Sequence, residues 1–322
     1  TDVHLWKGQL PIPCPIILGH ETVGVIEKLG DGLETDWKGQ TLRVGDRVTW
    51  SAGMSCGACH FCAVLRQRTR CLNRSAYGIS FTSDEPPHFS GGYAEYMYLQ
   101  PGTAIFKITD ISNEAVIGAG CALVTAIHGL ERMRIGWGDS VVIQGSGPVG
   151  LAALAVAKSS GARKTIVIGG PSARLDLAKT FGADHAIDID EFSEPAARLD
   201  EVRLHTAGYG ADAVIECVGS PNVVAEGFEM CRDGGKYLVL GHYGDAGTAP
   251  LNPHIITRKQ LTVYGSWASE PRHMGLAIEF LRGQIERFPF DRMVSHRFPL
   301  DGTFEAIRTT ERWAASKSVV IP

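Results

Sequence analysis

The sequence predicts an α/β protein of two domains, a small β-rich domain and a doubly wound parallel sheet. Three observations point to this class. The 322 residues are about two domains' worth of chain. Roughly the first third is rich in glycine, proline and short β-type runs. From Ala122 onwards, apolar strand-like segments alternate with helical ones, which is typical of a doubly wound sheet.

The first domain, residues 1–121, is expected to be barrel-like. Its β-type runs are Thr22–Ile26, Arg47–Trp50 and Tyr93–Leu99, separated by turns such as Gly45-Asp46. Short strands joined by glycine-rich turns favour a small barrel over an open sheet.

The second domain, residues 122–265, is expected to hold six parallel strands: Ser140–Gln144, Thr165–Ile168, His185–Asp188, Ala213–Glu216, Tyr237–Leu240 and Thr262–Tyr264. Amphipathic segments between them predict helices over Val149–Ser160, Ala173–Phe181, Ala196–Ala207 and Val223–Arg232. The remaining residues, 266–322, are too few for a third domain, so we expect them to return to the first.

Composition narrows the function classes. With 31 Lys and Arg against 35 Asp and Glu, the net charge is −4, so neither nucleic acid nor an anionic membrane is an expected partner. The longest apolar stretch, Val141–Ala157, is interrupted by Gln144 and glycines and is too short to span a bilayer. No secretory signal is visible, so we expect a cytoplasmic protein. The chain starts at Thr1 without a methionine, and we expect an amino-terminal segment to precede it.

A glycine-rich turn follows the first strand of the second domain and precedes its first helix. In a strand, GxGxxG and helix order, the first glycine allows the tight turn, the second lets the backbone approach a pyrophosphate, and the third lets helix and strand touch. The sequence therefore predicts a dinucleotide site. Its residues are Gly145, Ser146, Gly147, Pro148, Val149 and Gly150.

No carboxylate stands at the end of the second strand, where one would bind the adenosine ribose of NAD. The chain there reads Gly169-Gly170-Pro171-Ser172-Ala173-Arg174. Gly169, Ser172 and Arg174 are therefore candidate cofactor residues, and the last two can bind the 2′-phosphate of NADP. Arg174 can equally begin the next helix with its guanidinium in solvent. The choice between NAD and NADP stays open.

Four of the eight cysteines are close in sequence, at Cys56, Cys59, Cys62 and Cys71. Thiolates suit tetrahedral zinc, and a closed shell of four leaves no position for substrate, so we predict a structural zinc site. An iron–sulfur cluster fits less well, because Cys71 is not followed by proline. A nucleic-acid zinc module is disfavoured by the acidic charge of the chain.

Several motifs occur in a fixed order along the chain: TDVH at 1–4, PIILGHE at 15–21, GDRV at 45–48, the four cysteines, GGYAEY at 91–96, Cys121 and the glycine-rich turn. In this combination the chain resembles the zinc-containing medium-chain dehydrogenases, which include the zinc alcohol and polyol dehydrogenases. The resemblance implies a discontinuous GroES-like catalytic domain around a Rossmann domain, with the active site in the cleft. Relative to the usual family spacing, one extra residue separates Cys62 from Cys71.

The resemblance also implies a second, catalytic zinc. Its ligands would be a cysteine two residues before Thr1, His20 and Cys121, with the Glu21 carboxylate behind the metal or exchanging onto it. Thr1 and His4 would pass the alcohol proton to water. Lys317 resembles the family's basic residue near the pyrophosphate. Gly241 and Ser266 end the fifth and sixth strands at the edge where ligands collect, so both are candidate nicotinamide contacts.

The activity that these features imply is a zinc-dependent alcohol dehydrogenase. It would transfer hydride reversibly from the zinc-bound alkoxide of a primary or secondary alcohol to NAD or NADP. A polyol or amino-alcohol dehydrogenase of the sorbitol or threonine type is the alternative, and Cys121 in place of an acidic residue favours the alcohol branch. A different class is an inactive binding protein that keeps only the structural zinc. The family implies a homodimer or homotetramer.

Overall fold

The computed structural model describes residues 1–312 and 315–322 and divides into two compact units. Unit 1 comprises Thr1–Cys121, Ala268–Ile285 and Phe290–Pro322, and unit 2 comprises Ala122–Trp267 and Glu286–Pro289. Unit 1 is thus built from three separate stretches of chain.

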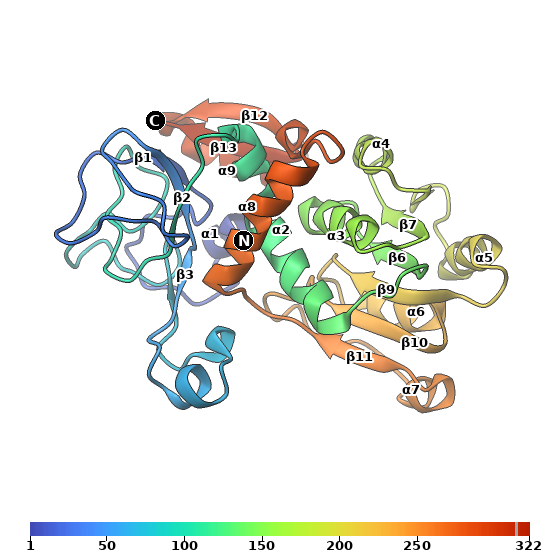
Figure 1. The fold of residues 1–322 in the computed structure, drawn as a ribbon. Helices are drawn as coiled ribbons and strands as arrows, with labels where there is room; N and C mark the ends of the chain where they lie inside the picture. The colour runs from blue at the N-terminus through green and yellow to red at the C-terminus, as the bar shows by residue number, and fades with distance from the viewer. Residues whose placement is uncertain (313–314) are drawn as a thin grey trace. The chain divides into compact units, whose positions relative to one another are not determined.

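Unit 2 is organised around a six-stranded parallel sheet in the order β11-β10-β9-β6-β7-β8 (Figure 1). The strands are β6 (Ser140–Gln144), β7 (Lys164–Gly169), β8 (His185–Asp188), β9 (Ala211–Glu216), β10 (Cys231–Val239) and β11 (Thr262–Gly265). All five residues of β6 are buried, as expected for a central parallel strand covered on both faces. The predicted Rossmann-type α/β class is confirmed.

Helices alternate with these strands along the chain. They are α2 (Asn113–Met133), α3 (Pro148–Ser159), α4 (Ser172–Thr180), α5 (Pro195–His205), α6 (Asn222–Met230) and α7 (His254–Lys259). Proline stands at the first position of α3 and of α5, where its missing N–H costs no hydrogen bond. Among the described residues, α2 alone is long and apolar enough to span a membrane, but 61% of its most apolar window is buried within the protein, as in a core helix.

Unit 1 contains the GroES-like fold, with a three-stranded antiparallel sheet in the order β1-β2-β5. Its elements are α1 (Asp2–Trp6), β1 (Val23–Val25), β2 (Arg47–Trp50), β3 (Gly53–Met54), η1 (His60–Val64), η2 (Arg68–Arg70), β4 (Ser75–Ala76) and β5 (Ile105–Lys107). The carboxyl-terminal stretches add α8 (Pro271–Gln284), η3 (Phe290–Met293), β12 (Val294–Pro299), η4 (Leu300–Gly302), α9 (Thr303–Glu311) and β13 (Lys317–Ile321).

The predicted strand over Tyr93–Leu99 is wrong. This segment has no strand, and its neighbour Ile105–Lys107 pairs with β2 instead. The reason is a close contact just before it: the N–H groups of Gly92 and Tyr93 donate to the carbonyls of Gly19 and Leu18 at 2.8 and 3.0 Å. These bonds join two loops, so the β-type run does not continue into a ladder.

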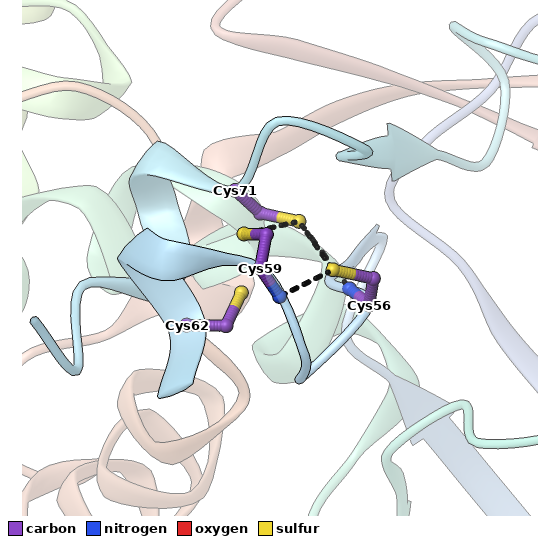
Figure 2. Close-up of side chains that lie close together, drawn as sticks. All are labelled: Cys56, Cys59, Cys62 and Cys71. Carbon is purple, nitrogen blue, oxygen red and sulfur yellow. Dashed lines mark hydrogen bonds between the residues drawn. The ribbon is translucent and has the colours of Figure 1, made fainter. Parts of the chain in front are cut away.

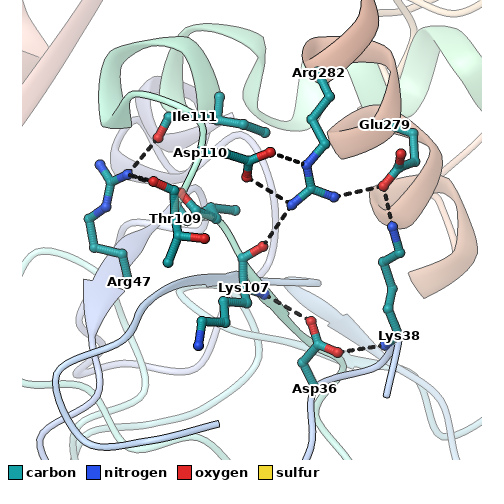
Figure 3. A network of polar contacts seen from close by, with 10 residues as sticks. Asp36, Lys38, Arg47, Lys107, Thr109, Asp110, Ile111, Glu279 and Arg282 are labelled. Atoms are coloured by element: carbon teal, nitrogen blue, oxygen red, sulfur yellow. Dashed lines mark hydrogen bonds and ion pairs between the residues drawn. The ribbon is translucent and has the colours of Figure 1, made fainter. Parts of the chain in front are cut away.

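A polar network joins separate stretches of unit 1 (Figure 3). Arg282 on α8 donates to both carboxylate oxygens of Asp110, at 2.7 and 2.9 Å, and to Glu279 at 2.7 Å. Arg47 on β2 donates to the carbonyls of Ile108 and Ile111 at 3.0 and 2.8 Å. Helix α8 is therefore bound to the segment that follows β5.

Candidate functional site

A cluster of metal-ligand types lies in unit 1. The ligand atoms of His20, Glu21 and Cys121 are within 4.8 Å of one another, and all three residues are half-buried. His20 and Glu21 lie in the segment before β1, and Cys121 lies in α2 just after a kink at Gly120. Imidazole, thiolate and carboxylate at this spacing fit zinc, so the residues present suit the metal that the sequence predicts.

Glycines allow the segment that bears His20 to lie directly on another loop. A Cβ on Gly91 would be 1.9 Å from the carbonyl oxygen of Ile17, so no side chain fits there. Gly19 has φ +95°, a left-handed conformation that glycine adopts without strain, and its own Cβ would be 2.8 Å from the nitrogen of Tyr93. The backbone contact fixes where the His20 side chain begins.

Asp2 orients the imidazole of His20. Its Oδ1 lies 2.8 Å from His20 Nδ1, which leaves Nε2 for a metal. Burial lowers the pKa of His20, but the Asp2 carboxylate raises it more, so the pKa lies well above its ordinary value. Sequence reasoning missed Asp2 as a partner of His20, although an acidic residue in the opening TDVH motif was a usable signal.

Lys317 on β13 neutralises Glu21. Its Nζ lies 2.8 Å from Glu21 Oε2, while Glu21 Oε1 accepts the backbone N–H of Cys121 at 2.5 Å. Burial raises the pKa of Glu21, but Lys317, His20 and the N–H of Cys121 together outweigh it and hold this pKa well below its ordinary value. A Cβ on Gly120 would be 2.1 Å from Glu21 Oε1, which explains a glycine at the kink. The structure thus places Lys317 beside the metal-ligand cluster, and its predicted contact with the pyrophosphate stays a prediction.

Thr1 and His4 lie at the start of unit 1. Thr1 is the N-cap residue of α1, and its carbonyl accepts the N–H of Leu5 at 2.9 Å. His4 is exposed, and its Nδ1 contacts the side-chain oxygen of Gln9. An exposed imidazole can exchange a proton with water, so the predicted relay role is compatible with this position.

The four cysteines of the predicted structural zinc site also come together (Figure 2). Cys71 Sγ lies 3.5 Å from Cys56 Sγ and 4.0 Å from Cys59 Sγ. Four thiolates at about 2.3 Å from a tetrahedral zinc would be about 3.8 Å apart. The sulfur positions therefore fit zinc, and the extra residue between Cys62 and Cys71 is absorbed in the loop.

Backbone N–H groups surround these sulfurs. The N–H of Cys59 donates to Cys56 Sγ and the N–H of Cys56 donates to Cys71 Sγ, at 3.4 and 3.3 Å. The backbone donors at Ala58 and Cys59 lower the pKa of Cys56 to about 6, whereas burial raises the pKa of Cys62 to about 12. Amide donors stabilise thiolates, which are the form that binds metal.

The glycine-rich turn of unit 2 has the geometry of a phosphate-binding turn. Gly145 has φ +112°, and a Cβ on Gly150 would be 1.9 Å from the Gly145 carbonyl oxygen. Around Gly147 there is free space: among the described residues outside its own stretch of backbone, the nearest atom to its Cβ position is a guanidinium nitrogen of Arg174, at 3.9 Å. Pro148, Val149 and Gly150 form the first turn of α3, whose amino terminus favours an anion.

Residues after β7 complete this site. Ser146 Oγ donates to the carbonyl of Gly170 at 3.1 Å, which links the turn to the loop that carries Gly169 and Ser172. Arg174 is only 8% exposed, so its side chain does not extend into solvent, and it lies beside Gly147. Burial lowers the pKa of Arg174. A buried guanidinium next to the turn is suited to a phosphate or ribose oxygen.

Gly241 and Ser266 follow β10 and β11. Ser266 Oγ lies 3.1 Å from His128 Nδ1. The N–H of Gly241 donates to Glu216 Oε2 at 3.0 Å, and Oε1 of the same carboxylate accepts from Val218 at 2.6 Å. Glu216 is fully buried and so fixes two loops at the carboxyl edge of the sheet. Sequence reasoning missed it, although a glutamate ending an apolar strand is unusual.

Comparison with known proteins agrees with this arrangement. Residues 1–110 match the family model of the alcohol dehydrogenase GroES-like domain, and residues 148–282 match that of the zinc-binding dehydrogenases. Among curated proteins, the chain is 35% identical to 5-exo-hydroxycamphor dehydrogenase of Pseudomonas putida, over 99% of this chain and 88% of that protein. It is 30% identical to sorbitol dehydrogenase of Halalkalibacterium halodurans, over 97% and 85%.

Solved structures are also similar. An alcohol dehydrogenase from Thermotoga maritima superposes with a TM-score of 0.94 at 33% identity, covering 100% of this chain and 88% of that one. A protein from Sinorhizobium meliloti, described as a zinc-binding dehydrogenase and bound to NADP, gives a TM-score of 0.85 at 27% identity, with coverages of 100% and 88%.

Proposed function

Since the chain belongs to the zinc-containing medium-chain alcohol dehydrogenase family, and is thereby a zinc-dependent oxidoreductase that uses NAD(P), we propose that it oxidises a primary or secondary alcohol reversibly to an aldehyde or ketone. The single observation that carries this proposal is the cluster of His20, Glu21 and Cys121 in a chain that also holds a phosphate-binding turn. A metal site alone, or a dinucleotide turn alone, would fit many other activities.

His20 and Cys121 would hold the catalytic zinc, and Gly145–Gly150 with Arg174 would hold the dinucleotide. Zinc supplies a Lewis acid that lowers the pKa of an alcohol hydroxyl, and the nicotinamide accepts a hydride. The four cysteines at 56, 59, 62 and 71 would hold the second, structural zinc, where no position is left for a substrate.

The chain's own residues prepare the site. Asp2 keeps His20 in the orientation that offers Nε2, and Lys317 holds Glu21 beside Cys121 by charge pairing. The hydroxyl of Thr1 would accept the alcohol proton, and His4, which is exposed, would release it to water. In unit 2, Gly241 and Ser266 would contact the nicotinamide half of the cofactor.

A polyol is the second candidate substrate class. The similarity to a sorbitol dehydrogenase supports it, while a cysteine at 121 favours the simpler alcohols. We further propose a cytoplasmic homodimer or homotetramer. None of the eight cysteines is in a disulfide, which suits a reducing compartment.

The test is a panel of monohydric alcohols and polyols assayed with NAD⁺ and NADP⁺ in parallel, by the absorbance of the reduced cofactor. We expect monohydric alcohols to be oxidised faster than polyols. Cys121→Ser should lose most of the activity, whereas Cys14→Ser, a change at an exposed cysteine away from both clusters, should retain it. No cofactor reduction with any alcohol, in protein that holds two zinc ions per chain, would contradict the proposal.

A further inference from the structure

The hydrogen bonds at the metal-ligand cluster continue beyond Asp2. Tyr93 donates its hydroxyl proton to Asp2 Oδ2 at 3.0 Å, while the other oxygen of the same carboxylate bonds His20 Nδ1 at 2.8 Å. The three side chains therefore form one chain of charge-assisted bonds that ends on the imidazole. Asp2 is only 19% exposed at its side chain, so water competes weakly for its oxygens.

The backbone explains why this tyrosine reaches Asp2. The N–H of Tyr93 donates to the carbonyl of Leu18, two residues before His20, at 3.0 Å. A Cβ on Gly92 would be 2.6 Å from Thr22 Oγ1, so the two loops lie in contact on both sides of His20. Tyr93 and His20 thus start from fixed positions, and Asp2 on α1 joins their side chains.

We propose that Tyr93 is a positioning residue for the catalytic zinc: its hydroxyl holds the Asp2 carboxylate so that His20 presents Nε2 to the metal. The inference rests on the proposed function and adds to it a residue outside the ligand set. It requires Tyr93 to keep its proton. Burial and the neighbouring Asp2 raise the pKa of Tyr93 well above its ordinary value, so the hydroxyl remains a donor at all working pH values.

The expected effect is on metal affinity. Outer partners of metal-binding histidines typically contribute 10- to 100-fold to affinity or activity. Tyr93 is one step further out than Asp2, so we expect Tyr93→Phe to weaken zinc binding by about tenfold, at the low end of that range. The zinc at the four cysteines should be unaffected, because none of the three side chains contacts them.

Tyr77→Phe is a matched control. Tyr77 is a fully buried tyrosine of the same unit, and its hydroxyl contacts Thr103 Oγ1 and accepts the N–H of Gln100, both at 2.6 Å; neither partner belongs to the cluster. Each variant removes one hydrogen-bonded tyrosine hydroxyl from unit 1 without changing the ring. A general loosening of the unit would therefore appear in both variants, and a specific effect in one.

The experiment equilibrates purified holoenzyme with graded chelator and counts the zinc ions retained per chain. We expect Tyr93→Phe to lose its first zinc at about tenfold lower chelator activity than wild type, and Tyr77→Phe to match wild type. In an Asp2→Asn background the tyrosine change should have little further effect, because Tyr93 acts through Asp2. Replacement of the labile zinc by cobalt gives a second readout, the visible absorption of the site.

Equal zinc retention by Tyr93→Phe and wild type would overturn the inference, as would equal losses in Tyr93→Phe and Tyr77→Phe. If Tyr93→Phe does not fold, the inference is decided by Asp2→Asn and Asp2→Ala. Both variants must lose zinc more readily than wild type, and Asp2→Ala more readily than Asp2→Asn. In all these cases a wild type with two zinc ions leaves the proposed function standing. A wild type that holds one zinc overturns both.

Discussion

Two neighbouring glycines of the phosphate turn should respond to the same substitution in opposite ways. Gly150→Ala places a methyl group 1.9 Å from the Gly145 carbonyl oxygen, a backbone atom that cannot move without opening the turn. Gly147→Ala places a methyl group in open space, with one side-chain atom 3.9 Å away, at φ −79° and ψ −177°, which any residue adopts. Gly150→Ala should therefore lower the stability of the fold, and Gly147→Ala should lower the affinity for the cofactor.

The sizes follow from these contacts. Overpacking of the kind expected for Gly150→Ala costs about 1–3 kcal/mol, whereas an alanine in place of the N-cap glycine at 147 costs less than about 1 kcal/mol. For the cofactor, a methyl group at 147 occupies the space through which a pyrophosphate approaches the backbone. Loss of one hydrogen bond to a charged group, about 1.5–3 kcal/mol, lowers affinity roughly 10- to 150-fold.

Thermal unfolding and calorimetric binding of ADP measure the two effects separately. We expect Gly147→Ala to unfold near the wild-type temperature and to bind ADP at least tenfold more weakly. Gly150→Ala should unfold several degrees lower, at roughly 2–4 °C per kcal/mol for a unit of this size. Wild-type affinity for ADP in Gly147→Ala would refute the assignment of this turn to a phosphate.

Four further predictions concern charged groups. Asp2 outweighs burial and raises the pKa of His20, so the metal-free ring is protonated near neutral pH. Because zinc binds only the unprotonated ring nitrogen, zinc affinity should rise with pH, and Asp2→Asn should make that rise smaller in zinc titrations. The contribution of this pair to folding is complete between about pH 3.8 and pH 6.5, the ordinary pKa values of Asp2 and His20; it is lost as pH falls through the lowered pKa of Asp2 and as pH rises through the raised pKa of His20, which unfolding of zinc-free protein at several pH values will show. Arg174→Gln should weaken ADP binding about tenfold by calorimetry, because it removes a guanidinium from beside the turn; unchanged affinity would exclude a cofactor contact. Arg282→Met breaks the paired bonds to Asp110, and since Asp110 is largely exposed we expect a loss of only about 1 kcal/mol in urea unfolding, against an unchanged midpoint if the pair contributes nothing.

The sheet of unit 2 could be predicted closely because its signal is local. Ser140–Gln144 and His185–Asp188 have the predicted bounds. The bounds of β7, β9 and β11 differ from the prediction by at most two residues at an end, whereas β10 begins six residues earlier and ends one residue earlier than predicted. A parallel strand covered on both faces must be apolar throughout, and this pattern is visible without knowledge of its neighbours. In unit 1, Tyr93–Leu99 shows the opposite case: its residue types are those of a strand, but no strand pairs with it and β2 pairs with Ile105–Lys107 instead.

The metal ligands of the candidate site could be predicted from the sequence, but the residues that hold those ligands in place could not. His20, Cys121 and the four clustered cysteines occur in motifs whose residue types are typical of metal ligands. The contacts of Asp2, Tyr93 and Lys317 join segments far apart in the sequence, and no local pattern records them. Predicting such contacts requires knowledge of the fold, because a single hydrogen bond between distant segments produces no periodic pattern in the sequence.

The three-part composition of unit 1 has a consequence for how the protein is made. Its first 121 residues leave the ribosome early, yet α8 and β13, with which they pack, are synthesised only after the whole of β6–β11. Unit 2 is nearly continuous in sequence, so its sheet can form during translation. The first 121 residues meanwhile keep apolar surface exposed, because their partners in unit 1 have not yet been synthesised. Translation stalled before residue 268 should therefore give a chain with a protease-resistant centre and a protease-sensitive beginning, dependent on chaperones until the last 55 residues arrive.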